Sequence, residues 1–462
     1  MSDDALHHCA VIDIGKTNVK IHVIDEQYRS RFRRSRANKV IEQGIYPHYD
    51  THSLWRWIRS TLKDIAHDYR IDSISITTHG ATAALVHPDA GEAGLVLPIM
   101  DYEYDGVASE ADYLAIRPPF SETCSPALPA GLNLGRQIFW QQRYCERAFN
   151  GAQYILPYPQ YWAWRLTGVA VAEVSSWGCH TDMWSPQSRQ YSSLVDHLNI
   201  RDKLPPLVAA STMIGTVTEE IVEQTGLPES CQVYAGVHDS NASYLRYLAR
   251  STAQSFTVIS TGTWSISFSS GTPLSRLDEF KDMLANVDIL GNAVACARFM
   301  GGREFDVICQ RTGSKPEDRY DLQDVQNIID SDIVALPNFS EGSGPFGARR
   351  PEIRGRTDCG VALASLYCAL VMDYQLDLLD ARGDLIIEGA WLRNPLLCRL
   401  LAQLRGKQDI YLSSDETGTV TGAAQLALPK AADPALTVLS ASTLAGLASY
   451  RQRWRACLGD RR

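Results

Sequence analysis

Several features that mark particular classes of protein are missing from this sequence. Its eleven cysteines include no C-x-x-C pair, so we expect free thiols in a reducing compartment rather than a disulfide framework or a zinc site. The formal net charge of −9 argues against nucleic acid as the main partner. There is no low-complexity tract, and no apolar run looks long enough to span a bilayer, so we expect no membrane partner.

In other respects the composition is that of an ordinary globular protein. A chain of 462 residues is too long for one hydrophobic core, which predicts two large domains. Residues 1–8 are polar and acidic, so we expect no signal peptide and a cytoplasmic location. The strongest basic cluster, residues 29–36 (R-S-R-F-R-R-S-R), is more typical of a solvated loop or a strand edge than of a binding site.

Residues 11–25 (V-I-D-I-G-K-T-N-V-K-I-H-V-I-D) predict a strand, a glycine turn and a second strand. A glycine turn lets backbone N–H groups approach an anion closely. Asp13, at the end of the first strand, could hold Mg²⁺ through water. The turn residues that could contact phosphate oxygens or add positive charge are Gly15, Lys16, Thr17, Asn18 and Lys20. An ordinary hairpin with a charged tip is the alternative interpretation.

Polar residues also lie beside three further strands, predicted at residues 71–77, 82–87 and 95–100. Open α/β sheets place their ligands where buried strands end. The residues near these strand ends that could contact a substrate are His79, Gly80, Thr82, Asp101 and Glu103. Taken singly, a core histidine and a solvated acidic loop are the simpler interpretations.

Apolar spacing predicts helices at residues 51–70, 136–149 and 160–166, with Trp57 on the apolar face of the first helix and Trp55 on its flank. Residues 121–135 are rich in proline and glycine and predict a loop. Residues 173–184 (E-V-S-S-W-G-C-H-T-D-M-W) are dense in polar and aromatic side chains, which is typical of a pocket wall. Trp177 and His180 could face a sugar ring, although aromatic packing explains Trp177 equally well.

Residues 233–244 (V-Y-A-G-V-H-D-S-N-A-S-Y) form a second stretch with chemical potential. A short apolar strand leads to His238 and Asp239, and small residues then open a helix. The helix dipole and the free N–H groups of its first turn hold a carboxylate ionised there. Asp239 could therefore accept a hydroxyl proton, with His238 beside it; the alternative is that Asp239 is only an N-cap.

Residues 255–269 (S-F-T-V-I-S-T-G-T-W-S-I-S-F-S) again predict strand, glycine turn and strand, with Thr261, Gly262 and Thr263 at the tip. This stretch repeats the plan of residues 11–17 about halfway along the chain, except that Ser260 replaces Asp13. Two copies of a phosphate-binding hairpin imply a duplicated fold that holds a nucleotide.

At this point the chain resembles the FGGY carbohydrate kinases of the actin-like ATPase superfamily, over residues 9–430. D-I-G-K-T-N-V-K and I-S-T-G-T-W look like the two phosphate motifs of the family, and G-V-H-D-S-N-A-S looks like its catalytic-base segment. The resemblance implies an α/β fold of two duplicated, ribonuclease H-like domains, residues 1–245 and 246–462, with a cleft between them. Closure of the domains would exclude water during transfer.

The resemblance also implies roles for particular residues. Asp239 would deprotonate the sugar hydroxyl, and Asp13 would position Mg²⁺. Thr17, Thr261, Gly262 and Thr263 would surround the phosphates. Residues 385–404 have the layout of the adenosine-binding strand–loop–helix of the family, which points to Gly389, Ala390 and Asn394. Residues 417–428 resemble a late helix of the family.

Some positions depart from the family pattern. Lys16 stands where Thr or Ser is usual, and Glu388 stands where a glycine of the adenosine loop is common. The segments expected to contact sugar are most similar to those of rhamnulose and fuculose kinases, but Thr82 replaces their acidic residue and His79 an aromatic one. Glu103 falls where those kinases keep an Asp.

We therefore expect an ATP- and Mg²⁺-dependent kinase that phosphorylates a small ketose such as L-fuculose or L-rhamnulose. Another ketose or polyol kinase, of the xylulose type, is the nearest alternative. A sugar-binding pseudokinase and a chaperone-like or actin-like ATPase on the same fold are alternatives from other classes. The sequence leaves the oligomeric state open, with a homodimer as one assembly.

Overall fold

The computed structural model describes residues 7–108, 111–248, 255–347, 349–415, 417–428, 430 and 434–459. The chain divides into two compact units. Unit 1 comprises Met1–Arg250, Ala285–Ala293 and Thr417–Asp433, and unit 2 comprises Ser251–Leu284, Val294–Glu416 and Pro434–Arg462. The sequence suggested one division, between residues 245 and 246, whereas unit 1 also includes two segments from later in the chain.

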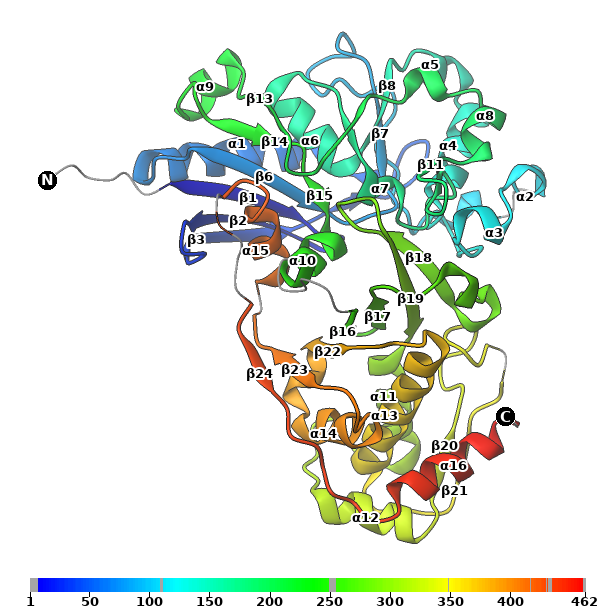
Figure 1. The fold of residues 1–462 in the computed structure, drawn as a ribbon. Coiled ribbons are helices and arrows are strands. Elements are labelled where there is room, and N and C mark those ends of the chain that lie inside the picture. The colour runs from blue at the N-terminus through cyan, green and yellow to red at the C-terminus, as the bar shows by residue number, and fades with distance from the viewer. Residues whose placement is uncertain are drawn as a thin grey trace, which may run out of the picture. The chain divides into compact units, whose positions relative to one another are not determined.

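Unit 1 is built on a mixed sheet in the order β13-β14-β6-β1-β2-β3, with β15 also paired to β6 (Figure 1). The central strand β1 is antiparallel to β2 and parallel to β6, because the glycine turn returns the chain directly and a helix carries it across to β6. The strands are β1 (His8–Ile14), β2 (Asn18–Asp25), β3 (Ser30–Ala37), β6 (Ser73–Thr78), β13 (Met213–Thr216), β14 (Gln232–Tyr234) and β15 (Val237–His238). The basic cluster forms β3, the strand at one edge.

Unit 2 contains most of a second sheet, in the order β18-β19-β17-β16-β22-β23-β24, of which residues 285–287 of β18 and residue 293 of β19 belong to unit 1. Its strands are β16 (Phe256–Thr261), β17 (Ser265–Ser269), β18 (Met283–Val287), β19 (Ala293–Phe299), β22 (Asp384–Gly389), β23 (Ile410–Ser413) and β24 (Leu436–Val438). Strands β19-β17-β16-β22-β23 repeat the succession of two antiparallel and then two parallel pairings found in β3-β2-β1-β6-β14. The duplication predicted from the two glycine turns is confirmed by this shared topology.

Helices cover both sheets, and short elements fill the loops. In unit 1 the helices are α1 (Thr51–Asp68), α2 (Ala111–Ile116), α3 (Phe120–Thr123), α4 (Leu134–Tyr144), α5 (Glu146–Asn150), α6 (Tyr158–Thr167), α7 (Val174–Trp177), α8 (Ser193–His197), α9 (Glu219–Thr225), α10 (Asp239–Leu248) and α15 (Gly418–Ala424). In unit 2 they are α11 (Gly301–Thr312), α12 (Leu322–Asp330), α13 (Gly360–Leu378), α14 (Pro395–Leu404) and α16 (Leu447–Cys457). The remaining strands are β4 (Val40–Ile41), β5 (His48–Tyr49), β7 (Ala83–Val86), β8 (Tyr154–Pro157), β9 (Ala172–Glu173), β10 (Trp184–Ser185), β11 (Gln190–Tyr191), β12 (Leu207–Val208), β20 (Val334–Leu336) and β21 (Glu352–Arg354).

Helix α1 shows where periodicity alone misassigns a residue. Trp55 is only 4% exposed, whereas Trp57 is half-buried, so the expected placement of Trp57 on the buried face and Trp55 on the flank is wrong. The reason is the neighbouring helix α6: Trp162 lies 6.1 Å from the Trp55 ring, and the Arg165 guanidinium lies 4.3 Å from its centroid. Tertiary packing therefore decides which of the two indoles is buried.

Two other expectations from the sequence differ from the structure. The strand expected at residues 95–100 forms only isolated bridges, at Leu95 and Met100. Helix α13 is, within the described part of the chain, long and apolar enough to cross a membrane by length and composition, so the expectation that no such run exists is wrong. In the structure 89% of this apolar stretch is buried within unit 2, where α11, α12 and α14 pack against it, as expected of a core helix.

Candidate functional site

The first glycine turn, residues 15–17, is held rigid by the backbone around it. The Gly15 N–H donates to the Asn18 carbonyl at 2.9 Å, and the Asn38 side chain donates to the Gly15 carbonyl at 2.9 Å. Thr17 and Asn18 are exposed at the tip, with the Asn18 amide 3.1 Å from the Thr17 hydroxyl. The turn therefore presents backbone and hydroxyl groups to solvent, as an anion-binding loop requires.

Asp13 lies near the end of β1, two residues before Gly15, and is 6% exposed. The antiparallel register places Lys20 opposite it, with Nζ 3.5 Å from Oδ2. Burial raises the pKa of Asp13 to about 6, Lys20 counteracts the rise, and the nearby charge of Asp239 adds to it. A buried carboxylate beside a second carboxylate suits a divalent cation, because the added positive charge relieves both burial and repulsion.

Asp239 is the first residue of α10 and keeps 31% of its side chain exposed. Its Oδ1 accepts a hydrogen bond from the Ser240 N–H at 2.6 Å, and His238 Nε2 lies 3.2 Å from the same oxygen. Within the described part of the chain, Oδ2 has no hydrogen-bond partner. Burial raises the pKa of Asp239, and the hydrogen bonds from the Ser240 N–H and hydroxyl act against this rise. Oδ1 therefore contacts the N–H of the next residue at the helix start, whereas Oδ2 stays available to a ligand.

His238 is packed tightly against two other elements. Its Nε2 lies 3.6 Å from Cys179 Sγ, and the Asn241 amide lies 3.2 Å from its Nδ1. A Cβ on Gly80 would approach His238 Nε2 to 2.8 Å and Cys179 Sγ to 3.4 Å. The glycine at position 80 is therefore required by the packing of His238, which the sequence did not reveal.

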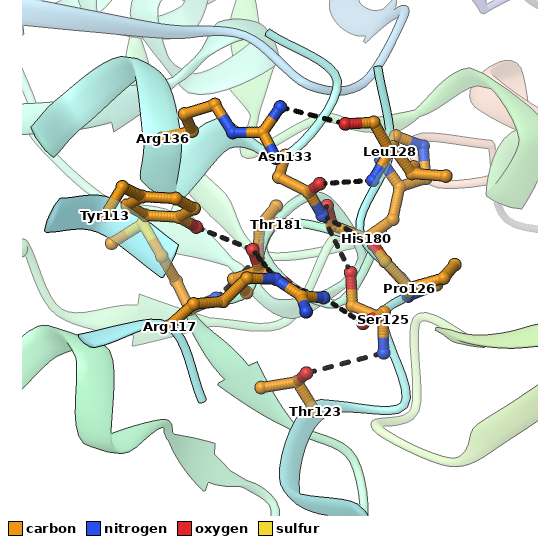
Figure 2. Close-up of polar contacts among 12 residues, drawn as sticks. Tyr113, Arg117, Thr123, Ser125, Pro126, Leu128, Asn133, Arg136, His180 and Thr181 are labelled. Atoms are coloured by element: carbon orange, nitrogen blue, oxygen red, sulfur yellow. Dashed lines mark hydrogen bonds and ion pairs between the residues drawn. The ribbon is translucent and has the colours of Figure 1, made fainter. Parts of the chain in front are cut away.

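A buried polar network fixes the turn that carries Cys179 (Figure 2). Asn133 donates to the His180 carbonyl at 3.1 Å and accepts from the Leu128 N–H at 2.8 Å. Asp182 pairs with Arg117, Nε to Oδ2, at 2.9 Å. The proline- and glycine-rich loop predicted at residues 121–135 is thus tied to the 178–182 turn, so both are held in one arrangement.

Trp177 lies in the hydrophobic core of this region. Its side chain is 0% exposed and its ring meets Tyr191 edge-on, with centroids 6.1 Å apart. This placement favours the packing role that the sequence left open over contact with a sugar.

Lys16 leaves the glycine turn and reaches residues 101–103. Its ammonium donates to Asp101 Oδ1 and lies 3.2 Å from Glu103 Oε2. It also lies 5.3 Å from the centroid of the Tyr49 ring and 5.0 Å from that of Tyr102. Lys16 was predicted to add positive charge at the phosphates, but its ammonium is paired with Asp101 and Glu103, which were predicted to bind sugar.

His79 is buried among three tyrosines, with ring centroids 5.1 Å from Tyr49, 5.3 Å from Tyr102 and 5.1 Å from Tyr158. Burial lowers its pKa to about 4, so the ring is neutral. Nδ1 lies 3.0 Å from the Gly80 carbonyl and 3.5 Å from the hydroxyl of Thr82, which is itself buried. Nε2 is buried and has no partner within the described residues.

The second glycine turn, residues 262–264 of unit 2, also joins two antiparallel strands through three residues. The Gly262 N–H donates to the Trp264 carbonyl at 2.8 Å, and the Gly302 N–H donates to the Thr263 carbonyl at 3.2 Å. A side chain at Gly302 would collide with the Gly262 carbonyl, so the start of α11 can lie against the turn only because residue 302 is glycine. The N-terminus of a helix favours anions.

The hydroxyl of Thr261 is used inside the fold. It donates to the Glu388 carbonyl at 2.6 Å and accepts from the Trp391 N–H at 3.0 Å. Gly389 has φ +88° and packs against the Thr261 backbone, where a Cβ has no room. Thr261 and Gly389 therefore join β16 to the end of β22 and shape the loop, with both bonds of the Thr261 hydroxyl made inside the fold.

Beside this turn lies a cavity of about 530 Å³, within the usual range for small-molecule sites. It is lined by residues that include Gly262, Thr263, Gly302, Phe305, Ala390 and Asn394. Asn394 caps α14, accepting from the Leu397 N–H at 3.2 Å, and its Oδ1 accepts from the Tyr320 hydroxyl at 2.6 Å. Gly302 and Phe305 were not predicted from the sequence, although the Gly-Gly pair at residues 301–302 was a usable signal for Gly302.

Comparison with known proteins agrees with this architecture. Residues 9–245 match the N-terminal domain of the FGGY family of carbohydrate kinases, and residues 253–435 match the FGGY C-terminal domain. A carbohydrate kinase from Novosphingobium aromaticivorans is similar in structure, with a TM-score of 0.90 and 34% identity over 98% of this chain and 99% of that one. Xylulose kinase from Rhodospirillum rubrum, at 17% identity and a TM-score of 0.78 over 98% of both chains, shares the fold.

Curated relatives are more distant. L-fuculokinase from Salmonella typhi is 24% identical over 270 residues, which is 55% of each chain. A xylulose kinase from Staphylococcus epidermidis is 24% identical over 238 residues, 50% of this chain and 46% of that one. The chain thus spans about half the length of the curated relatives it matches. Nevertheless, both FGGY domains match this chain in the order of the family and together cover most of its length. The chain therefore belongs to the FGGY family of carbohydrate kinases.

Proposed function

We propose that this protein transfers the γ-phosphate of ATP to a hydroxyl group of a small neutral ketose such as L-fuculose or L-rhamnulose. The observation that carries the proposal is Asp239, a half-buried carboxylate with one oxygen bound at a helix start and the other available. Family membership and the similarity to L-fuculokinase support the choice of reaction and of substrate class.

Asp239 acts as the general base in this proposal. Phosphoryl transfer depends mainly on alignment and charge neutralisation, so the base needs only to accept the hydroxyl proton as the oxygen attacks. The Ser240 N–H fixes Oδ1, which leaves Oδ2 to receive that proton. Because burial raises the pKa of the carboxyl group, the proton is held more firmly than by an exposed aspartate.

Asp13 is the residue that would hold Mg²⁺. No cluster of three or more metal-ligating side chains occurs among the described residues, but Mg²⁺ usually takes one or two carboxylates and completes its shell with water and substrate phosphates. When bound, the metal would neutralise charge on the phosphates. In unit 2 the cavity beside Gly262 and Thr263 is the proposed nucleoside site.

The charges of the unit 1 site favour a neutral acceptor. Carboxylates outnumber ammonium groups there, and both ammonium groups are already paired with carboxylates. The groups concerned are Asp13, Asp101, Glu103 and Asp239 on the acidic side and Lys16 and Lys20 on the basic side. An anionic sugar would be repelled, whereas hydroxyl groups can bond to either kind of side chain.

The test is ADP release with Mg-ATP and a panel of L-fuculose, L-rhamnulose, D-xylulose and glycerol. We expect turnover with a ketose and a loss of about 10²- to 10⁴-fold in Asp239→Asn, with the thermal melt retained. Binding of a ketose without ADP release would contradict the proposal and favour the pseudokinase, and a preference for D-xylulose would favour the alternative substrate. A cytoplasmic location and a homodimer stay predictions.

A further inference from the structure

Lys16 and His79 contact the same two aromatic rings from different elements. The Lys16 ammonium comes from the first glycine turn, and His79 follows β6, yet both lie about 5 Å from the rings of Tyr49 and Tyr102. Asp101 anchors this arrangement, because its Oδ1 accepts from Lys16, from the Tyr49 hydroxyl at 3.3 Å and from the Glu103 N–H at 3.1 Å. The ammonium is therefore built into the residues expected to contact sugar.

The hydrogen-bond roles of the two side chains follow from their partners. A carbonyl oxygen only accepts, so His79 Nδ1, which lies 3.0 Å from the Gly80 carbonyl, carries the proton. Nε2 of the neutral ring is then an acceptor, and this buried atom has no donor within the described residues. A buried acceptor without a donor is costly, which points to a ligand hydroxyl as its partner.

Lys16 supplies the complementary group. An ammonium has three N–H donors, and Asp101 and Glu103 account for two. Its side chain is 18% exposed, so the third donor can reach a ligand. Tyr102 is the half-buried member of the rings around His79, whereas Tyr49 and Tyr158 are fully buried; displacement of Tyr102 is thus the least costly way to expose Nε2.

We propose that Lys16 and His79 form a donor–acceptor pair that recognises the positions of the hydroxyl groups of the sugar. Lys16 then determines which sugar is bound and does not bind the phosphates. Lys16 donates to one sugar oxygen, and His79 Nε2 accepts the proton of a hydroxyl group. This inference rests on the proposed sugar kinase function, but it assigns to Lys16 a role that the position of the residue in a phosphate loop does not suggest.

The first experiment compares Lys16→Thr with two matched lysine variants. Lys20→Thr removes the other ammonium of the same hairpin, which pairs with Asp13, and Lys63→Thr removes an exposed lysine of α1. Lys16→Thr is expected to raise the KM for the preferred ketose by about 10- to 100-fold, the loss of one charge-assisted hydrogen bond, and to leave the KM for ATP within about twofold. Lys20→Thr is expected to act on the ATP side, and Lys63→Thr on neither.

Direct binding separates this inference from the proposed function. Calorimetry measures the affinity for L-fuculose, L-rhamnulose and D-xylulose in the absence of nucleotide. We expect Lys16→Thr to bind the ketose more weakly than the wild type. We expect His79→Phe, which keeps a ring and removes the acceptor, to lose about 2- to 10-fold in affinity. Lys16→Thr/Asp101→Asn restores the charge balance without the donor, so it should melt like the wild type and still bind sugar weakly.

The possible outcomes are distinct. A rise in the KM for ATP with unchanged ketose binding in Lys16→Thr would overturn the inference and leave the kinase function standing. A wild type that binds a ketose in a Lys16-dependent way but releases no ADP would support the inference and refute the kinase activity. A wild type that binds none of the three ketoses would overturn both.

Discussion

Replacement of Asp13 by Asn tests whether this carboxylate is kept for function at the expense of stability. Asn has nearly the same shape as Asp and resembles its protonated form, so the change removes the charge and little else. Burial raises the pKa of Asp13 from its ordinary 3.8 to about 6, which corresponds to about 3 kcal/mol of free energy. We expect Asp13→Asn to be more stable than the wild type by up to that amount at pH 8.

The sign of the pH dependence follows from the direction of the pKa change. Below pH 3.8 the carboxyl is protonated in both the folded and the unfolded chain, and the two proteins differ little. Between pH 3.8 and 6 the unfolded chain has lost this proton while the folded wild type still keeps it, so the free energy of unfolding of the wild type falls relative to that of the variant. Above pH 6 the carboxyl is ionised in both states, and the difference stays constant. The stabilisation should therefore develop between about pH 4 and 6.

Thermal melts from pH 4 to 8 measure this difference, and ADP release measures the expected loss of Mg-ATP turnover. Asp64→Asn is the matched control, because Asp64 is 52% exposed and pairs with Arg34 at the surface; we expect a change below about 1 kcal/mol. A variant less stable than the wild type at pH 8 would refute the reasoning, since it would mean that the pair of Asp13 with Lys20 stabilises the fold.

Two further substitutions test packing and a buried ion network. Gly80→Ala places a Cβ 2.8 Å from His238 Nε2, so overpacking should lower the free energy of unfolding by about 1–3 kcal/mol and slow ADP release. Gly406→Ala, whose Cβ meets nothing nearer than 3.6 Å, is the control and should change neither quantity. Equal melts and rates in the two variants would contradict the packing. Asp377→Asn removes a carboxylate that lies 2.7 Å from an arginine of α16. Burial raises the pKa of Asp377, but hydrogen bonds from Arg405 and Arg455 lower it overall, so the change should cost about 1–3 kcal/mol, whereas Asp332→Asn, at an exposed ion pair, should cost less than about 1 kcal/mol. Melts and limited proteolysis near the C-terminus measure both, and similar losses would refute a special role for the network around Asp377.

The parts of the fold that the sequence predicted depend on neighbours along the chain. Apolar strands on either side of a glycine predict the two strand–turn–strand hairpins. A carboxylate followed by small residues predicts the start of α10. Such local signals gave the duplicated fold and, through the resemblance, the family.

The parts that it did not predict depend on distant residues. Lys16 lies within the phosphate motif in sequence, but the direction of its side chain is set by Asp101, 85 residues away. Thr261 carries a hydroxyl at the predicted tip, yet a carbonyl on β22 uses that hydroxyl inside the fold. The requirement for glycine at residue 80 likewise comes from His238, which no nearby residue signals. Side-chain direction is a tertiary property, so motif spacing alone assigns these residues only to a neighbourhood.

The short helix α15 belongs to unit 1 although it lies near the end of the chain. Its residues Val420, Ala423 and Ala424 pack with Val11 of β1, and the Ser75 hydroxyl of β6 donates to the Ala423 carbonyl at 2.7 Å. While the ribosome is still synthesising the second half of the protein, this side of the nascent first sheet is covered by α10 but lacks the cover that α15 supplies. We therefore expect the N-terminal half to depend on chaperones until almost the whole chain has emerged, and premature termination before residue 417 to yield an aggregating fragment.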